Sequence, residues 1–416
     1  MPLNNPESQD VYWVNLPDLS NSLQSMQVQR GVGTSTNGAA SFGASVSMQT
    51  IGGQAKAYGD FSSAYGQYNT MLLSAAAGTG ILKNGLSLDA RYSYTKSDGY
   101  IRNGKVDHKN LFATLSHYTD KQMIRLVYIN GNQHTGITWL GVDPEMLAKD
   151  RRYNSAGKYT DDNGKDRYYD NETDNYFSNI AQLLYTRHLT NELTINANAS
   201  YNNGYGYYEN YKVADPIYNY LAMYGLSPQV VNGVTYDVTD LIGRELMSND
   251  LYFGSANLTY HKDKLTLTGG AMYSYYDGDN YGKLMWVKYN QNIADDYKWY
   301  DNNSKKKDMN AFVKGEYRPS ESLSLFAEVQ DRYIDYRMHG LDDDLVNLSS
   351  NNYYNFLNPK AGASFRFSKY NEVYGSLAVS NREPLRTDLK NASKGGGREV
   401  KPERLYDYEL GYRYAN

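Results

Sequence analysis

The stretch from Glu192 to Asn202, ELTINANASYN, alternates between apolar and polar side chains along its whole length. One face carries the apolar set Leu193, Ile195, Ala197, Ala199 and Tyr201. The other face carries the polar set Thr194, Asn196, Asn198, Ser200 and Asn202. A period of two is typical of a β-strand, and roughly 9–11 residues let a tilted strand cross a bilayer. This stretch therefore predicts a strand with one apolar face and one polar face.

The same alternation recurs in three later segments. Their apolar faces are Leu265, Leu267, Gly269, Ala271, Tyr273; Leu323, Leu325, Ala327, Val329; and Val373, Gly375, Leu377, Val379. None of these faces carries a charge, as lipid contact requires, because an Arg or Lys at the bilayer midplane costs about 2–4 kcal/mol. Tyrosines near the expected strand ends, such as Tyr92 and Tyr275, fit an interfacial girdle.

Short polar turns alternate with long polar excursions. The expected turns are 83–85, 119–121, 190–192, 262–264, 319–322 and 368–371, and the excursions are 95–108, 132–175, 204–249, 277–307, 338–354 and 381–402. This order is typical of an all-β, transmembrane, antiparallel up-and-down β-barrel with large loops on one rim. We count about thirteen strands, the last from Arg404 to Tyr414. Since closed bacterial barrels have an even number of strands, the count predicts a partial barrel.

Composition excludes several other classes. The 416 residues include 44 Tyr but 10 Phe and no Cys, which excludes disulfides and thiolate metal sites. No run of about 18 apolar residues predicts a transmembrane helix. A net charge of −4 argues against a nucleic-acid surface, and we expect the basic run Lys305–Lys307 to lie at the tip of a solvated loop.

No catalytic or metal constellation is visible in the sequence, so we expect no enzyme and no cofactor. The six histidines lack the i, i+4 pairing of zinc enzymes, and no GxSxG motif occurs. Gly33 and Gly38 have phosphate-loop spacing, but Ala39 stands where that loop needs Lys. The acidic runs Asp161-Asp162 and Asp342–Asp344 are expected to be solvated loop residues, because they lack EF-hand spacing.

Four segments resemble one family. They are PLNNPESQDVYWVNLPDL near the start, QVQRGVGTSTNGAASFGASVSMQT from Gln27 to Thr50, NREPLRTDLK from Asn381 to Lys390, and KPERLYDYELGYRY from Lys401 to Tyr414. In order, they resemble the plug and barrel of TonB-dependent outer-membrane receptors, closest to the Bacteroidetes-type branch for iron and siderophores. That family has a plug inside a barrel of about 22 strands.

The resemblance implies two domains. Residues 1–50 correspond to the C-terminal part of the plug, and residues 51–416 to the N-terminal portion of the barrel with long extracellular loops. The upstream plug, TonB box, signal peptide and last strands of the family have no counterpart in this chain. Gly31, Gly33, Gly38 and Gly43 suit tight turns inside a filled lumen.

The implied function is TonB-dependent active import of a scarce metal chelate (ferric siderophore, haem or cobalamin) across the bacterial outer membrane. Outer-membrane lipid, the TonB–ExbB–ExbD complex and the chelate are the implied partners. A SusC-like glycan or peptide importer is the first alternative, although its "AxxYG" and "NGVI" plug stretches are not what Thr36 to Thr50 shows. A porin or adhesin would lack a plug, and a soluble sugar-binding β protein would not keep its large loops on one rim.

The resemblance also suggests site residues. It implies an ion pair between Arg30 of the plug and Glu409 of the barrel wall. Ligand contact is expected at the outer end of the plug and in the long loops, because aromatic rings suit flat ligands and arginine suits anionic oxygens. The ligand-binding candidates are Tyr12, Trp13, His134, Trp139, Arg151 and Arg152.

Overall fold

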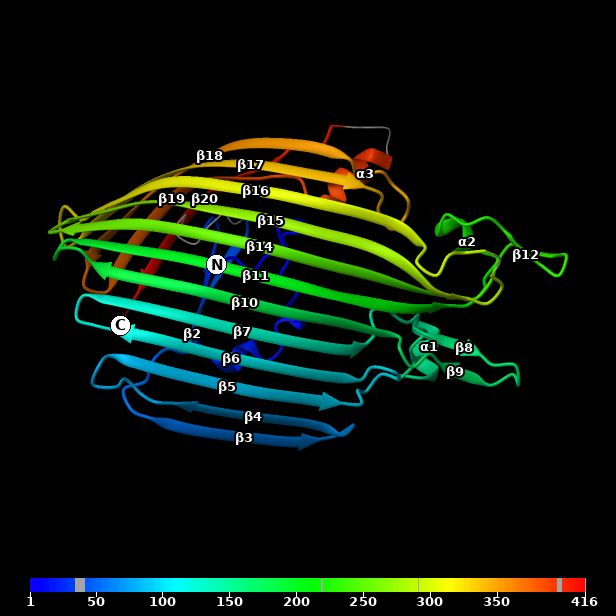
Figure 1. The fold of residues 1–416 in the computed structure, drawn as a ribbon. Helices are drawn as coiled ribbons and strands as arrows, with labels where there is room; N and C mark the ends of the chain where they lie inside the picture. The colour runs from blue at the N-terminus through cyan, green and yellow to red at the C-terminus, as the bar shows by residue number, and fades with distance from the viewer. Residues whose placement is uncertain (34–41, 218–219, 291, 395–398, 416) are drawn as a thin grey trace.

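One large antiparallel sheet dominates the computed structural model, which describes residues 1–33, 42–217, 220–290, 292–394 and 399–415. Its strands pair in chain order, and the sheet curves around the N-terminal residues (Figure 1). The strands are β3 (Tyr58–Gly66), β4 (Thr70–Gly78), β5 (Leu86–Ser97), β6 (Val106–Tyr118), β7 (Gln122–Gly136), β10 (Thr173–His188), β11 (Leu193–Lys212), β14 (Leu241–Lys262), β15 (Leu265–Val287), β16 (Lys298–Tyr317), β17 (Leu323–Gly340), β18 (Ser350–Ser368), β19 (Asn371–Arg382) and β20 (Glu403–Tyr414).

Smaller elements lie before the sheet and in its loops. The N-terminal segment, residues 1–50, contains η1 (Trp13–Asn15), η2 (Leu19–Ser22) and a separate hairpin of β1 (Leu23–Arg30) and β2 (Ala44–Thr50). The loops contain α1 (Pro144–Lys149), the hairpin β8 (Lys158–Thr160) and β9 (Asp166–Tyr168), α2 (Tyr220–Met223), the hairpin β12 (Gln229–Val231) and β13 (Val234–Tyr236), and α3 (Arg386–Lys394). Figure 1 shows α1, α2 and α3 at the same end of the sheet, which we call the loop rim.

The antiparallel up-and-down order is confirmed, but the expected strand count was wrong. The sheet has 14 strands, not thirteen, and the strand that was missed is β3. Only residues 67–69 join β3 to β4 at the loop rim, so this hairpin breaks the pattern of long excursions from which the strands were counted. The inference from an odd number therefore fails. Within the described residues β3 and β20 are the two edges of an open sheet.

The strands are longer than the polar excursions suggested. β15 and β16 have 23 and 20 residues and take up most of the expected excursion 277–307. Lys305–Lys307 therefore does not lie at a loop tip, because all three residues belong to β16. Polar side chains on both faces hide a strand from a search for alternation, yet cross-strand pairs still stabilise it. One such pair joins the Lys305 ammonium and the Asp277 carboxylate at 3.3 Å.

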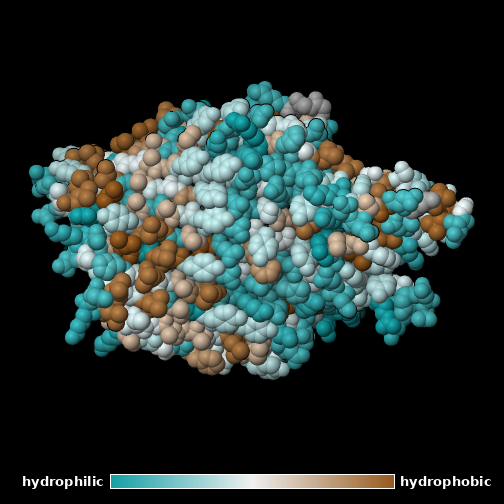
Figure 2. Space-filling view, viewed as in Figure 1, coloured by the Kyte–Doolittle hydropathy of each residue, from teal (hydrophilic) through white to brown (hydrophobic). Residues whose placement is uncertain are grey.

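The outer face of the sheet is apolar over the half nearer the short turns. Figure 2 shows hydrophobic side chains gathered there, whereas the loop rim is mostly hydrophilic. Val329, at an expected outward position, is 43% exposed, and Leu258 and Val313, which pair with the outward residues Ile195 and Gly269, are 46% and 59% exposed. Large apolar side chains on the surface of a protein are favourable where they contact lipid. Among the described residues, no helix is long and apolar enough to cross a membrane.

The concave inner face packs against the N-terminal segment. Leu19 of this segment joins a buried apolar cluster with Phe112, Val127, Ile129 and Ile180 of the sheet. At Gly131 of β7 the two parts approach so closely that a Cβ atom would lie 2.9 Å from Cδ of Pro17. Glycine is needed where two backbones come this near. The N-terminal segment is thus in tight contact with the inner face at β7.

Candidate functional site

Glu7 is the central acceptor of a buried polar cluster on the inner face. Its side chain receives hydrogen bonds from the hydroxyls of Tyr276 and Tyr336, each at 2.9 Å, and from Nη1 of Arg386 at 3.0 Å. Glu7 is 7% exposed. A carboxylate this far from water needs several donors and a counter-charge to offset its desolvation, and these three groups supply them.

A second set of charges lies beside Glu7. Lys306 of β16 contacts Glu383 at 2.6 Å and donates to the backbone carbonyl of Pro6 at 2.6 Å. Arg332 of β17 bridges Asp308 at 2.6 Å and Glu383 at 3.0 Å. Burial alone would raise the pKa of Glu383, but Arg332 and Lys306 outweigh it and lower this pKa to about 2. The wall of the sheet and the N-terminal segment therefore share one charge network.

The network continues into the loop rim through α3. Nη2 of Arg386 donates to Asp342 at 2.9 Å, in the loop between β17 and β18. Lys390, one turn further along α3, contacts the carboxylates of Asp342, Asp343 and Asp344 at 2.6, 2.7 and 3.2 Å. The oxygens of these three aspartates lie within 4.8 Å of one another, which is metal-like spacing, but three cations, Arg386, Lys390 and Lys394, already face them.

Two residues of β7 show which side chains near the candidate ligand residues face inward. Gly131 faces Pro17 of the N-terminal segment, and Gln133, two residues on, is fully buried on the same face. Gln133 donates to the Asp174 carboxylate at 3.0 Å, and Asp174 is paired with Tyr208 of β11. Side chains alternate along a strand, so Tyr208 lies on the inner face.

The structure brings three of the predicted ligand residues to the inner side. The ring of Trp139 meets that of Tyr208 edge-on at 5.8 Å. Tyr12 and Trp13 lie at η1, which contacts β7 and β10. All three side chains are about half exposed (57%, 49% and 54%, respectively). They are therefore accessible aromatic rings on the side of the sheet where a ligand entering from the loop rim would arrive.

The other three predicted ligand residues lie elsewhere. His134 follows Gln133 and so points to the outer face, where its ring contacts the side chain of Asn175. Arg152 donates to the carbonyl of Tyr100 at 2.7 Å and lies 5.4 Å above the ring of Tyr68. Arg152 therefore connects the β7–β10 loop to the β5–β6 loop and the β3–β4 turn. Arg151 beside it is exposed.

Glu409 lies near Gly31, the residue after Arg30, but within the described residues Arg30 and Glu409 form no ion pair. Asp407 and Glu409 of β20 instead approach Gly31, whose positive φ of 72° suits glycine. The backbone N–H of Val32 donates to Asp407 at 3.2 Å. The Arg30–Glu409 pair therefore stays a prediction. Gly38 and Ala39 lie outside the described residues.

The charge network itself was missed in the sequence. Glu7 lies in the first of the four family-like segments, and Glu383 and Arg386 lie in NREPLRTDLK, but no local pattern in either segment marks these residues as partners. Arg332 had a clearer signal, because it is a charged residue at an inward position of an expected strand, whereas Lys306 lies in the run that was expected at a loop tip. Glu328, next to the outward Val329 and therefore on the inner face of β17, is buried and pairs with Lys360 at 2.8 Å.

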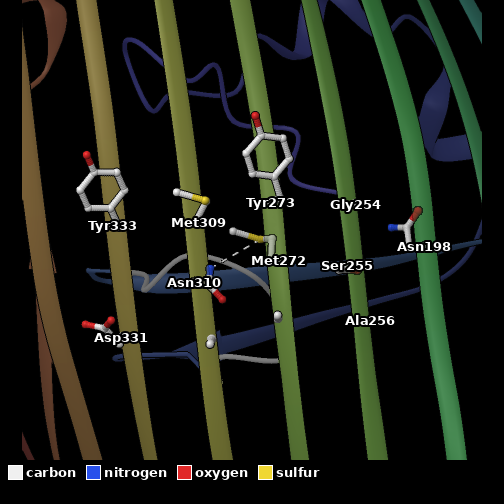
Figure 3. A pocket seen from close by; sticks show the side chains of 12 residues that line it. Asn198, Gly254, Ser255, Ala256, Met272, Tyr273, Met309, Asn310, Asp331 and Tyr333 are labelled. Atoms are coloured by element: carbon white, nitrogen blue, oxygen red, sulfur yellow. Dashed lines mark hydrogen bonds between the residues drawn. The ribbon is translucent and has the colours of Figure 1, made fainter.

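A hollow of about 630 Å³ lies over β14 to β17. It forms where outward side chains are small, at Gly254, Ala256, Ala271 and Ala311. Figure 3 shows the larger side chains of Tyr273, Met309 and Tyr333 standing around these positions. Because the small residues belong to the apolar outer face, acyl chains suit the hollow better than a polar ligand does.

Comparison with solved structures identifies the fold. The siderophore receptor PiuA from Acinetobacter baumannii is similar with a TM-score of 0.69 and 16% identity, over 94% of this chain and 60% of that one. The ferric-catecholate import receptor Fiu from E. coli K12 (0.65, 12%) covers 94% of this chain and 62% of its own. The copper transporter OprC (0.68, 13%) covers 95% and 57%.

No family profile and no curated protein sequence matches the chain. It spans about three fifths of the length of the receptors just named. At such low identities the likeness concerns the fold alone. Over nearly all of its described length, this chain has the fold of the outer-membrane receptors for siderophores and metals.

Proposed function

We propose that the chain is the greater part of a TonB-dependent importer of the bacterial outer membrane, with metal chelates such as ferric siderophores, haem or cobalamin as its substrates. In this proposal residues 1–50 belong to the plug and residues 51–416 to the barrel. The protein is a transporter and not an enzyme. Its partners are outer-membrane lipid and the TonB–ExbB–ExbD complex, which supplies energy.

One observation carries the proposal, namely that the N-terminal segment fills the inner face and is held there by buried charges. A passive porin needs an open, wet lumen, whereas a gated importer needs a blocked one. Glu7 and its three donors are the contact that keeps the segment in place. In water, the outer face would expose many large apolar side chains to the solvent. Membrane lipid is therefore the favourable surrounding for this face.

Substrate class is supported by the exposed rings of Tyr12, Trp13 and Trp139. Flat or aryl ligands stack on such rings, and many metal chelators are aryl or macrocyclic compounds. The similar solved proteins are titled siderophore, ferric-catecholate and copper receptors or transporters. The metal here is cargo inside its chelate, so the chain needs no metal ligands of its own.

The test is uptake by a strain that lacks only this gene. We expect loss of growth on at least one iron chelate, haem or cobalamin supplied as the sole source, and loss of radiolabelled uptake of the same compound. Collapse of the proton gradient should abolish uptake in the parent strain. If uptake of every chelate and vitamin equals that of the parent, while growth on a glycan or peptide fails, the substrate class is wrong and a SusC-like role replaces it.

A further inference from the structure

Arg386 contacts the N-terminal segment and the loop rim at the same time. Its Nη1 donates to the Glu7 carboxylate at 3.0 Å, and its backbone N–H donates to the Glu7 carbonyl at 3.1 Å. Its Nη2 donates to Asp342 at 2.9 Å. Arg386 is the first residue of α3, so the helix in the β19–β20 loop begins on the N-terminal segment.

The two loops at this position are also tied to each other. Lys390 of α3 contacts Asp342 at 2.6 Å and Asp343 at 2.7 Å, and Lys394 contacts Asp344. Leu389 of α3 packs on the buried cluster that contains Leu348 of the β17–β18 loop. The β17–β18 loop and α3 are therefore one packed unit, which we call the rim clamp (residues 341–349 and 386–394).

The charges within the rim clamp balance, because Asp342, Asp343 and Asp344 face Arg386, Lys390 and Lys394. Glu7, outside the rim clamp, is the second carboxylate that Arg386 contacts. When Glu7 leaves, Arg386 loses both its ion pair and its backbone acceptor on the N-terminal segment. Its other carboxylate partner, Asp342, belongs to the rim clamp, so only neutral hydrogen bonds to Asn302 at 2.9 Å and Ser304 at 3.2 Å then join Arg386 to β16.

We propose that Glu7 and Arg386 form a latch that couples seating of the N-terminal segment to closure of the rim clamp. While Glu7 is seated, the rim clamp lies closed over the inner face. When Glu7 leaves its site the rim clamp is released, and opening of the rim clamp weakens the hold on Glu7 equally. Such coupling between two sites is reciprocal by thermodynamic necessity. The latch goes beyond the proposed function, because it depends neither on transport nor on the identity of a substrate.

The experiment uses the whole protein in isolated outer membranes and measures maleimide labelling of single cysteines, since the chain has no Cys of its own. Leu348→Cys reports on the rim clamp, because Leu348 is 1% exposed in the closed state. Ser22→Cys reports on the N-terminal segment, because Ser22 is fully buried and the exchange is nearly isosteric. Ala156→Cys, 1% exposed in a different loop, is the control site.

Glu7→Gln is expected to raise the labelling rate of Leu348→Cys by about fivefold or more, as a typical coupling free energy implies. Asp342→Asn is expected to raise the labelling rate of Ser22→Cys by a similar factor. Asp161→Asn, which removes a carboxylate in the β8–β9 turn, is the matched control and should change neither rate.

The latch is refuted if Leu348→Cys labels at the parental rate in Glu7→Gln protein, or if Ala156→Cys labelling rises in parallel. Should Glu7→Gln protein fail to assemble, the Asp342→Asn arm decides alone, because its substitution lies in a loop. Labelling does not require uptake. A failed latch with intact chelate uptake, or the reverse, therefore separates this inference from the proposed function.

Discussion

Glu7 and Arg386 are 379 positions apart in the chain, and their side chains meet at 3.0 Å on the inner face of the sheet. The contact joins the N-terminal segment to a loop helix across the whole described fold. Around it lie Lys306, Arg332 and Glu383, all nearly excluded from water. Removing one partner from a buried charge network is costly, because it leaves an uncompensated charge out of water.

Arg332→Met should show that cost. The substitution leaves Asp308 and Glu383 buried with only Lys306 nearby, and we expect a loss of about 3–5 kcal/mol in the free energy of unfolding. Urea unfolding of the purified protein in detergent micelles measures it. Lys149→Met is the control, because it removes an ion pair with Glu145 whose side chains are 65% and 80% exposed. Such a surface pair contributes under about 1 kcal/mol. Equal losses in the two variants would contradict a buried role for Arg332.

The contribution of Glu383 to the stability of the fold should be lost only at low pH. Glu383 lies in the β19–β20 loop, and its pKa is lowered to about 2 from an ordinary value of about 4.3. A lowered folded-state pKa stabilises the fold fully above the ordinary value, and this contribution is lost as the pH falls toward the folded value. We therefore expect the stability gap between the parent and Glu383→Gln to stay constant from pH 7 to about pH 5 and to close between about pH 4.3 and pH 2. Urea midpoints across this range measure the gap. A gap that closes above pH 5 would mean that Glu383 is not ion-paired.

The two faces of β11 permit a matched pair of substitutions. Ile195→Arg places a charge on the apolar outer face, which costs about 2–4 kcal/mol near the bilayer midplane, so we expect reduced assembly into the membrane. Asn196→Arg points to the inner face, where Asn196 bonds Thr186 and Asn257, and should assemble nearly normally. Heat-modifiable mobility of the outer-membrane fraction measures assembly. Normal assembly of the Ile195 variant would show that this face does not contact lipid.

Local patterns predicted the strands well, because consecutive residues of a strand alternate between its two faces. Ile195 and Asn196 illustrate this, because the strand predicted from Glu192 to Asn202 is found as β11, which begins at Leu193 and continues to Lys212. Patterns failed where both faces become polar, as at Lys305–Lys307, and where a tight turn replaces a long loop, as after β3. The site was harder to predict. Nothing local to Glu7 indicates that Tyr276, Tyr336 and Arg386 will surround it, since contacts between distant segments depend on how the sheet curves around the N-terminal segment.

A comparison of Trp139 with His134 tests the location of the ligand site. Both were candidates from sequence, but Trp139 meets Tyr208 on the inner face and His134 points outward. Loss of one stacking ring removes about 1 kcal/mol of ligand affinity, so we expect Trp139→Ala to weaken chelate binding roughly fivefold. His134→Ala should leave binding unchanged, because its ring points to the outer face, where it contacts Asn175 of β10. Equilibrium binding of the labelled chelate to whole cells at 0 °C measures affinity without transport. A loss at His134 with none at Trp139 would place the ligand on the wrong face of the sheet and would overturn the assignment of the inner side as the binding side.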